Sequence, residues 1–351
     1  MSQEWIRGPC QTASQSHRAS AQARQKQLTK PPGSLGLLET VVIELAALQR
    51  THAPVLARAP IVVFAGDHGV TAQGVSAYPA EVTVQMLRNF ASGGAAISVL
   101  ARELGSCLEI VDAGTFALEP IAGVTVDKPR CGTRDFTREA ALAAAEVDYA
   151  LACGRRAVER QAGMGPHILI LGEMGIGNTA AASAIASALL GCPPGEITGS
   201  GTGIDAEGLA RKARVIAAAL ELHHLKGASA EAVLAAVGGL EIIALTGAMI
   251  TAAQLGIPVL VDGFIASVAA LAAMRLNGAC RDWMLFSHRS AERGHGVLLG
   301  ALGARPILDL DLRLGEASGA ALALPTLRLA CALHNQMATF AEAAVSQRSV
   351  S

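Results

Sequence analysis

The sequence contains a series of short aliphatic runs, each followed by a polar or glycine-rich turn and then, in most cases, by an alanine-rich segment. This alternation constrains the fold most, because strands that alternate with helices form an α/β protein with a mainly parallel sheet. Ligands of such sheets bind outside the carboxyl ends of the strands, so we expect a site at the turns. The six runs that we predict to be strands are residues 61–65, 108–111, 168–171, 258–261, 283–286 and 307–312.

The apolar residues are mostly aliphatic, since 51% of the chain is hydrophobic but only 3% is aromatic. Charged residues make up 16%, against about 25% in typical soluble domains. This composition suits helices packed on a buried parallel sheet and excludes disorder as a description of the whole chain. The 28 basic and 29 acidic residues leave a net charge of -1, so we expect no nucleic-acid partner.

One uncharged stretch, residues 242–261, is long enough to cross a bilayer, which takes about 20 residues. Glycines, Gln254 and Pro258 interrupt this stretch. The pattern favours a buried helix, a turn at Gly256 and then a strand, and we predict no membrane span.

The seven cysteines are scattered, with no CxxC spacing, and the N-terminal residues lack the apolar segment of a secretory signal. We therefore predict a cytoplasmic protein with reduced thiols, and neither a disulfide framework nor a zinc site.

A glycine-rich turn over residues 172–179 follows a predicted strand and precedes an alanine-rich helix. Free backbone amides at a helix start bind anions, and glycines let a phosphate approach the backbone. The spacing is that of a P-loop, except that Asn178 stands where the lysine must be. The turn therefore indicates a site for a single phosphate, with a turn that binds no ligand as the alternative.

A second glycine-rich turn, residues 199–203, precedes a segment that carries Lys212. Two such turns can hold one phosphate from both sides, and Lys212 can add a charge-assisted hydrogen bond. The alternative is that Lys212 is an ordinary solvated residue of a helix.

Asp67 and His68 lie in a turn directly after the first strand. Both are common metal ligands, but no second His or Cys cluster completes a set, so we predict no metal and expect these residues to shape the pocket through hydrogen bonds. Tyr78 precedes a predicted helix that also carries Gln85. The Tyr78 ring stacks on a planar ligand or, alternatively, packs as a hydrophobic staple.

Residues 287–292 are polar and follow the fifth predicted strand. A Ser-His pair suggests a nucleophile, but no G-x-S-x-G turn is present, so we favour substrate hydrogen bonding with Ser290 as a candidate. Glu316 lies among small residues after the sixth run, and Glu173 lies in the first glycine-rich turn. We expect the two carboxylates to face one cleft as acid-base groups, with a helix cap or an ion pair as the alternative for either.

These motifs, in this order and together with residues 30–36, resemble the nicotinate-nucleotide–dimethylbenzimidazole phosphoribosyltransferase family over nearly the whole chain. The resemblance implies transfer of the phosphoribosyl group of nicotinate mononucleotide to 5,6-dimethylbenzimidazole, giving α-ribazole 5′-phosphate and nicotinate for cobalamin. It implies a Rossmann-like six-stranded sheet, a small helical lobe from both chain ends, a homodimer and no cofactor.

The resemblance also implies roles for single residues. Glu316 would be the general base, and Glu173 would assist it. Ser290 and Gly319 would contact the nicotinate. The residues near the phosphate and ribose would be Gly175, Gly177, Asn178, Thr179, Gly201, Gly203 and Lys212, and those near the benzimidazole would be Ser76, Tyr78 and Gln85.

Residues 1–57 and 320–351 are predicted to form the small lobe, with helices over 37–50 and after Pro325, and 58–319 the catalytic domain. The chain departs from the family pattern at Ser200, Arg293, Ala317 and Ser318, which concerns the shape of the pocket. Two alternatives to the transferase remain: a P-loop-like nucleotide hydrolase or kinase, and a protein that only binds a nucleotide with one phosphate.

Overall fold

Six strands form one sheet in the order β3-β2-β1-β4-β5-β6, and every neighbouring pair is parallel. The computed structural model describes residues 3–201 and 203–346. The strand order reverses between β1 and β4, and this reversal is where α/β sheets of the Rossmann type bind their ligands. The strands are β1 (Ile61–Gly66), β2 (Leu108–Gly114), β3 (Val124–Val126), β4 (Leu169–Met174), β5 (Val259–Val261) and β6 (Met284–Phe286).

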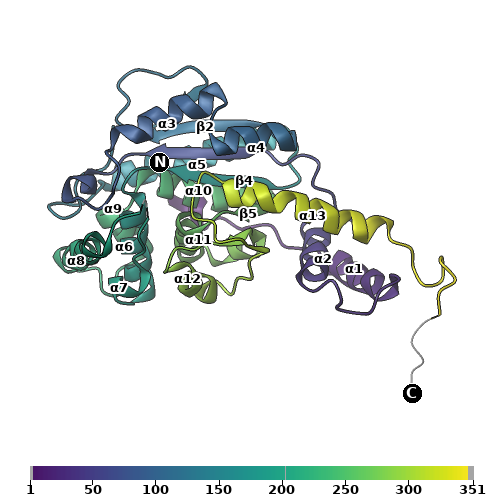
Figure 1. Ribbon diagram of the computed structural model, residues 1–351. Coiled ribbons are helices and arrows are strands. Elements are labelled where there is room, and N and C mark those ends of the chain that lie inside the picture. Colours follow the sequence, from purple (N-terminus) through teal and green to yellow (C-terminus); the bar gives the residue numbers. More distant parts are fainter. Residues whose placement is uncertain (1–2, 202, 347–351) are drawn as a thin grey trace.

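Helices cover both faces of the sheet, with α3 and α4 above it and α6 and α11 below it in Figure 1. The α-helices are α1 (Gln15–Gln27), α2 (Leu37–Gln49), α3 (Glu81–Ser92), α4 (Ala96–Leu104), α5 (Ala144–Ala162), α6 (Asn178–Leu190), α7 (Pro194–Ile197), α8 (Ala206–Leu222), α9 (Ala230–Val237), α10 (Leu240–Leu255), α11 (Phe264–Leu276), α12 (His295–Ala301) and α13 (Ser318–Gln336). Three short 3₁₀ helices are η1 (Gln3–Arg7), η2 (Gly69–Gln73) and η3 (Gly278–Trp283).

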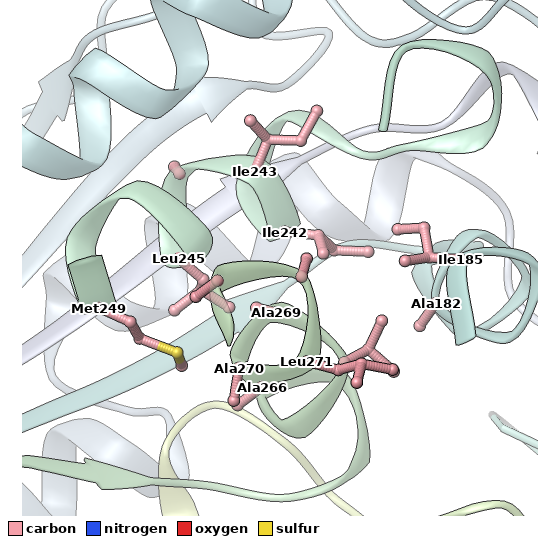
Figure 2. Close-up of a cluster of buried hydrophobic side chains, with 14 of the residues drawn as sticks. Ala182, Ile185, Ile242, Ile243, Leu245, Met249, Ala266, Ala269, Ala270 and Leu271 are labelled. Atoms are coloured by element: carbon pink, nitrogen blue, oxygen red, sulfur yellow. The ribbon is translucent and has the colours of Figure 1, made fainter. Parts of the chain in front are cut away.

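Side chains of β1 alternate between two apolar cores, as a strand covered on both faces requires. Val62 and Phe64 belong to the core with α5, α6, α10 and α11, whereas Val63 belongs to the core with α2, α3, α4 and α13. Figure 2 shows how small side chains of α11 let it pack closely against α10 and α6. This use of alanine in place of aromatic residues explains the low aromatic content.

The predicted α/β class and six-stranded parallel sheet are confirmed, but one of the six strands was wrongly assigned. Residues 307–312 do not join the main sheet: only β8 (Leu308–Asp309) is a strand, and it pairs with β7 (His288–Arg289). The sixth strand is instead β3, a three-residue edge strand beside β2. The last helix was predicted to follow Pro325, yet α13 begins at Ser318 and contains Pro325.

The helices α1 and α2 lie beside α13 at one side of the molecule (Figure 1), whereas η1, the first element of the chain, packs on α10. Arg24 donates from Nε to the His334 carbonyl oxygen at 2.6 Å, and Leu28 forms an antiparallel bridge with Thr339. The helix α13 is continuous across residue 320, so its first turns pack on the sheet and its last turns on the helical lobe. The division into 1–57, 58–319 and 320–351 stays a prediction, and its first two and last five residues lie outside the described ranges.

The uncharged stretch 242–261 divides as expected into the buried helix α10, a turn at Gly256 and the strand β5. Over residues 3–201 and 203–346, none of the helices is both long and apolar enough to cross a membrane.

Candidate active site

A cavity of about 470 Å³ lies at the carboxyl ends of β4, β5 and β6, and β4 lies at the point where the strand order reverses. The turn after β4, the start of α3, the second glycine-rich turn and the segment before α13 all contribute to its lining. The sheet thus brings together turns that are far apart in the sequence, as its topology predicts.

Glu316 reaches the cavity from a strained turn directly before α13. Three consecutive residues have left-handed backbone, with φ of 85° at Gly315, 62° at Glu316 and 66° at Ala317. Non-glycine residues seldom adopt this conformation, and it concentrates at functional sites. The turn lies directly on β4: a Cβ at Gly172 would be 2.3 Å from the Ala317 nitrogen.

The same turn brings Glu316 beside Glu173. The Glu316 amide donates to the Glu173 carbonyl oxygen at 3.2 Å, and both side chains line the cavity. Burial and the neighbouring Asp262 raise the pKa of Glu316 to about 7. Burial and the charges of Glu241 and Asp262 raise the pKa of Glu173 well above its usual value, although the Asn178 amide donates to its carboxylate. Two expected carboxylates therefore do face one cleft, and neither forms an ion pair with Lys or Arg among the described residues.

Asp262 is a third cavity carboxylate, which the sequence analysis did not select. It directly follows β5 and accepts a hydrogen bond from the Ala320 amide at 2.9 Å, so it fixes the start of α13. Burial raises the pKa of Asp262 to about 7 despite that backbone contact. His288 lies 3.8 Å away, and burial lowers the pKa of this imidazole to about 4, which keeps it neutral near pH 7.

The first glycine-rich turn leads directly into α6. Gly177 has a φ of 92°, a conformation that glycine adopts without strain, and it precedes the first helical residue, Asn178. Gly175, Asn178 and Thr179 line the cavity. A glycine-rich turn at a helix start is a common place for an anion, but here the Ile176, Asn178 and Ala180 amides already donate to Thr83, Gly175 and Gly177.

Lys212 connects the two glycine-rich turns through hydrogen bonds to both of them. It is fully buried, and its Nζ donates to Thr179 Oγ1 at 2.7 Å and to the Gly199 carbonyl oxygen at 3.3 Å. Burial lowers the pKa of Lys212 to about 8. The alternative of a solvated helix residue is therefore wrong. Thr202, in the second turn, lies outside the described residues.

Asp67 and His68 lie behind the first turn and not on the cavity surface. His68 Nε2 is 2.8 Å from Glu241 Oε1, and Asp67 accepts from the Phe116 amide at 2.7 Å. A Cβ at Gly175 would be 3.3 Å from both His68 Nε2 and Glu241 Oε1, so the pair supports that turn from beneath. Within the described part of the chain, no group of three or more His, Cys, Asp or Glu side chains could hold a metal ion.

The comparisons with known proteins agree with this geometry. A family model described as "DBI_PRT: Phosphoribosyltransferase" matches residues 10–345. The chain belongs to this phosphoribosyltransferase family.

Relatives in the family carry one name. The chain is 66% identical to the nicotinate-nucleotide–dimethylbenzimidazole phosphoribosyltransferase of Bradyrhizobium sp. (strain ORS 278), over 98% of this chain and 99% of the relative. It is 57% identical to the enzyme of that name from Ectopseudomonas mendocina (strain ymp), over 99% of both chains. The crystal structure of the Thermus thermophilus enzyme superposes with a TM-score of 0.90 at 44% identity, covering 95% of this chain and 100% of that one. The predicted family and the Rossmann-like fold are thus confirmed.

The residues predicted for the phosphoribosyltransferase site divide into two groups. Those that line the cavity are Tyr78, Glu173, Gly175, Asn178, Thr179, Gly201, Ser290 and Glu316. Those that do not line it are Ser76, Gln85, Gly177, Gly203, Lys212 and Gly319.

Several residues of the second group act from behind the surface. Gly319 leaves room for a cavity side chain, because a Cβ there would be 2.0 Å from His288 Nδ1. Ser76 accepts from the Tyr78 amide at 3.2 Å. Gln85 is exposed, whereas Val82 and Met86 of the same helix line the cavity. The roles given to single residues stay predictions.

Sequence reasoning missed Asp262, His288, Glu292 and Arg313, all of which line the cavity. The first three directly follow β5 or β6 or lie in the polar segment after them, so their place after predicted strands was an available signal. Arg313 follows a run that was taken for a strand of the main sheet, and no pattern marked it.

Proposed function

We propose that this chain transfers the phosphoribosyl group of nicotinate mononucleotide to 5,6-dimethylbenzimidazole, releasing nicotinate and forming α-ribazole 5′-phosphate. The observation that carries the proposal is Glu316, a buried carboxylate that lines the cavity and whose pKa burial raises to about 7. A general base works best when its pKa is near the working pH. The named relatives and the family membership support the choice of substrates.

The donor carries one phosphate, and the two glycine-rich turns suit such a group. Gly175 and Gly201 line the cavity, and Thr179 at the start of α6 offers a hydroxyl. Lys212 would act from behind this subsite, since it holds Thr179 and the second turn and brings a buried positive charge. Gly177 and Gly203 would give the turns their shape, with φ of 92° and 103°.

The acceptor is a flat aromatic base, and one side of the cavity suits it. Tyr78, Val82 and Met86 provide an apolar surface at the start of α3. Within this proposal the benzimidazole packs against that surface, with Ser76 and Gln85 as outer contacts. Ser290 and the region kept open by Gly319 would then receive the nicotinate.

The reaction needs one proton acceptor. A benzimidazole nitrogen attacks C1′ of the donor, the bond from C1′ to the pyridinium nitrogen breaks, and its electron pair leaves with nicotinate. The attack comes from the face opposite the leaving base, which converts a β linkage into an α linkage. The N–H proton of the acceptor passes to Glu316. Glu173 would assist by placing the substrates.

We propose further that the protein is a cytoplasmic homodimer. Support comes from the family resemblance, from seven free cysteines, and from exposed leucines on α13, of which Leu329 is 65% exposed. Light scattering on the purified protein measures the mass directly, and a monomer at assay concentration would contradict the dimer.

The proposed activity is tested by incubating the purified protein with nicotinate mononucleotide and 5,6-dimethylbenzimidazole and following nicotinate release. Nuclear magnetic resonance of the product then reports the configuration at C1′. The matched arm contains EDTA, in which we expect full activity because the leaving group is already cationic. Release of nicotinate without a benzimidazole would indicate a hydrolase, and binding of the nucleotide without consumption would indicate a binding protein.

A further inference from the structure

Glu292 is a cavity residue that the proposed reaction leaves without a role. Its side chain lines the cavity although the residue is only 8% exposed. Its Oε2 atom is buried and has no hydrogen-bond partner within the described residues. A buried carboxylate oxygen without a donor is costly, so such an atom in a residue that lines a binding cavity points to a donor on the ligand.

The second glycine-rich turn is shaped around this carboxylate. A Cβ at Gly199 would be 1.8 Å from Glu292 Oε2, so any other residue at this position would displace the side chain. The Glu292 amide donates to Ser290 Oγ at 3.3 Å, which fixes the backbone at its start. The carboxylate therefore lies against the second turn, where a glycine leaves room for it.

Lys212 and Arg313, two cationic residues of the cavity region, already donate hydrogen bonds within the protein. Lys212 donates to Thr179 and to the Gly199 carbonyl oxygen, and the charge of Glu292 acts on it from beyond ion-pair distance. Arg313 donates to the Gly201 carbonyl oxygen at 3.3 Å. Glu292 thus keeps an unfilled acceptor position within the substrate cavity.

The chemistry of the donor decides what can fill that position. An ionised carboxylate only accepts hydrogen bonds, so it repels the donor's phosphate and the carboxylate of its nicotinate. The sugar between those two groups carries hydroxyls at C2′ and C3′, which are donors. Acidic side chains bind ribose hydroxyls in this way in other nucleotide sites of Rossmann type.

We propose that Glu292 accepts hydrogen bonds from the ribose hydroxyls of the donor and so selects ribonucleotides over deoxyribonucleotides. This inference rests on the proposed function. No proton is transferred, and Glu292 is a binding residue and not a catalytic one. Its contribution is lost when either the carboxylate or the hydroxyl is removed, and removing both costs no more than removing one.

The test measures kcat/KM for nicotinate mononucleotide and for its 2′-deoxy and 3′-deoxy analogues, with the wild type and Glu292→Gln. A hydrogen bond to a charged group is worth about 10- to 100-fold in affinity. We expect the wild type to prefer the ribonucleotide over at least one analogue by that factor. Glu292→Gln should lose a similar factor with the ribonucleotide and less than about 3-fold with that analogue. Glu196→Gln, an exposed carboxylate on the neighbouring α7, is the matched control and should behave as the wild type.

Three results would overturn the inference. A wild-type enzyme that uses both deoxy donors as well as the ribonucleotide has no such contact, and this measurement needs no variant. An equal loss with all three donors in Glu292→Gln would mean that the residue acts through Lys212 or the turn. An unchanged kcat/KM for the ribonucleotide in that variant would exclude the contact. If the wild type releases no nicotinate from the ribonucleotide, the proposed function itself fails, which is a different outcome from these three.

Discussion

Two regions of this protein are rich in carboxylates, but the carboxylates are paired with arginines in one region and are without such partners in the other. On α5 and beside it, Asp127 and Glu146 lie 2.6 Å from Arg156 and Arg134 respectively. Burial alone would raise the pKa of each carboxyl, but the arginines hold both below their usual values. In the cavity, Glu173 and Glu316 have no such partner within the described residues, and burial raises both pKa values.

This difference separates carboxylates that stabilise the fold from carboxylates that are free to take part in a reaction. An ion pair satisfies the charge within the protein, so the α5 carboxylates are complete without a ligand. The cavity carboxylates are held near one another by the fold at a cost in stability, because each charge is desolvated and repelled by the others. A protein retains such an arrangement where a reaction uses it, and perturbed pKa values cluster at functional sites for this reason.

The largest effect is expected from Glu316→Gln, which keeps the size of the side chain but cannot accept a proton. General base catalysis contributes about 10²- to 10⁴-fold, so kcat should fall by that range while the KM for the donor changes little. Steady-state kinetics of nicotinate release measure both. The control is Glu119→Gln, an exposed glutamate. Near-wild-type kcat in Glu316→Gln would assign the proton to Glu173 or to solvent.

The glycines at the two ends of α6 offer a second contrast, because Gly177 lies in the turn next to the cavity-lining residues Gly175 and Asn178 and Gly191 lies at the opposite end of the helix. Gly177→Val places a branched side chain at a φ of 92°, and its Cβ would lie 2.7 Å from Thr71 Cγ2. Because the turn would be distorted where the phosphate approaches, the KM for the donor should rise at least about 10-fold. Gly191→Val is the matched control: its φ is 68° and its Cβ meets nothing within 4 Å. An unchanged donor KM in a folded Gly177→Val protein would remove the phosphate from this turn.

The pH dependence of the reaction should show the raised pKa of Glu316 directly. Below about pH 7 the carboxylate becomes protonated, so kcat should fall by up to about 10-fold for each pH unit, and this acidic limb should be absent in Glu316→Gln. The acceptor's ring nitrogen also protonates in mildly acid solution. Acceptors of different basicity separate the two, because a limb caused by the enzyme stays at the same pH for all of them. A limb that moves with the acceptor would contradict the assignment.

Much of the fold followed from the sequence, and the failures have physical causes. Strands β1, β4 and β5 are continuous aliphatic runs because both of their faces are buried, so they were recognisable. The edge strand β3 has only three residues and little burial, and it carries no comparable signal. Residues 307–312 are aliphatic for a different reason, since Ile307 and Leu308 pack against the core from outside the main sheet.

The sequence predicted residues whose place at the cavity follows from neighbouring residues in the chain. It missed features that depend on tertiary contacts. Glu173 was selected because it lies at the end of a predicted strand, and Glu316 because it lies among small residues, although the run before it is not a strand of the main sheet. The burial of Lys212 depends on Thr179, 33 residues away, which no local pattern reveals. Gln85 was expected at the cavity because of its amide, but the helical period turns Val82 and Met86 toward it and leaves Gln85 outside. The left-handed backbone of Glu316 and Ala317 likewise comes from their packing on Gly172.

The stability of the two regions should depend on pH with opposite signs. The folded pKa of Glu316 lies above its unfolded value, so its stabilising contribution is present at low pH and is lost as the pH rises toward 7. Glu316→Gln does not suffer that loss. Relative to the wild type, its free energy of unfolding should therefore rise between pH 5 and pH 8, by up to about 3 kcal/mol. Urea unfolding at the two pH values measures the difference. If the free energy of unfolding of Glu316→Gln, relative to the wild type, is the same or lower at pH 8 than at pH 5, the pKa of Glu316 is not raised.

The smallest effect on activity is expected from Asp127→Asn, which removes one charge from the other region. Arg156 donates to Asp127 through Nε at 2.9 Å and through Nη2 at 2.6 Å, and the variant leaves this guanidinium without its counter-charge. The free energy of unfolding at pH 8 should fall by about 1–3 kcal/mol, whereas kcat and both KM values should stay within about twofold of the wild type, because fully paired charges far from the reacting atoms carry no proton. The pKa of Asp127 is lowered in the folded state, so its stabilising contribution is present above the unfolded value and is lost as the pH falls. The deficit of Asp127→Asn should accordingly shrink toward pH 4, opposite to the trend for Glu316→Gln. If kcat falls as far in Asp127→Asn as in Glu316→Gln, ion pairing with arginine does not distinguish structural carboxylates from catalytic ones. The carboxylates on and beside α5 would then also belong to the active site.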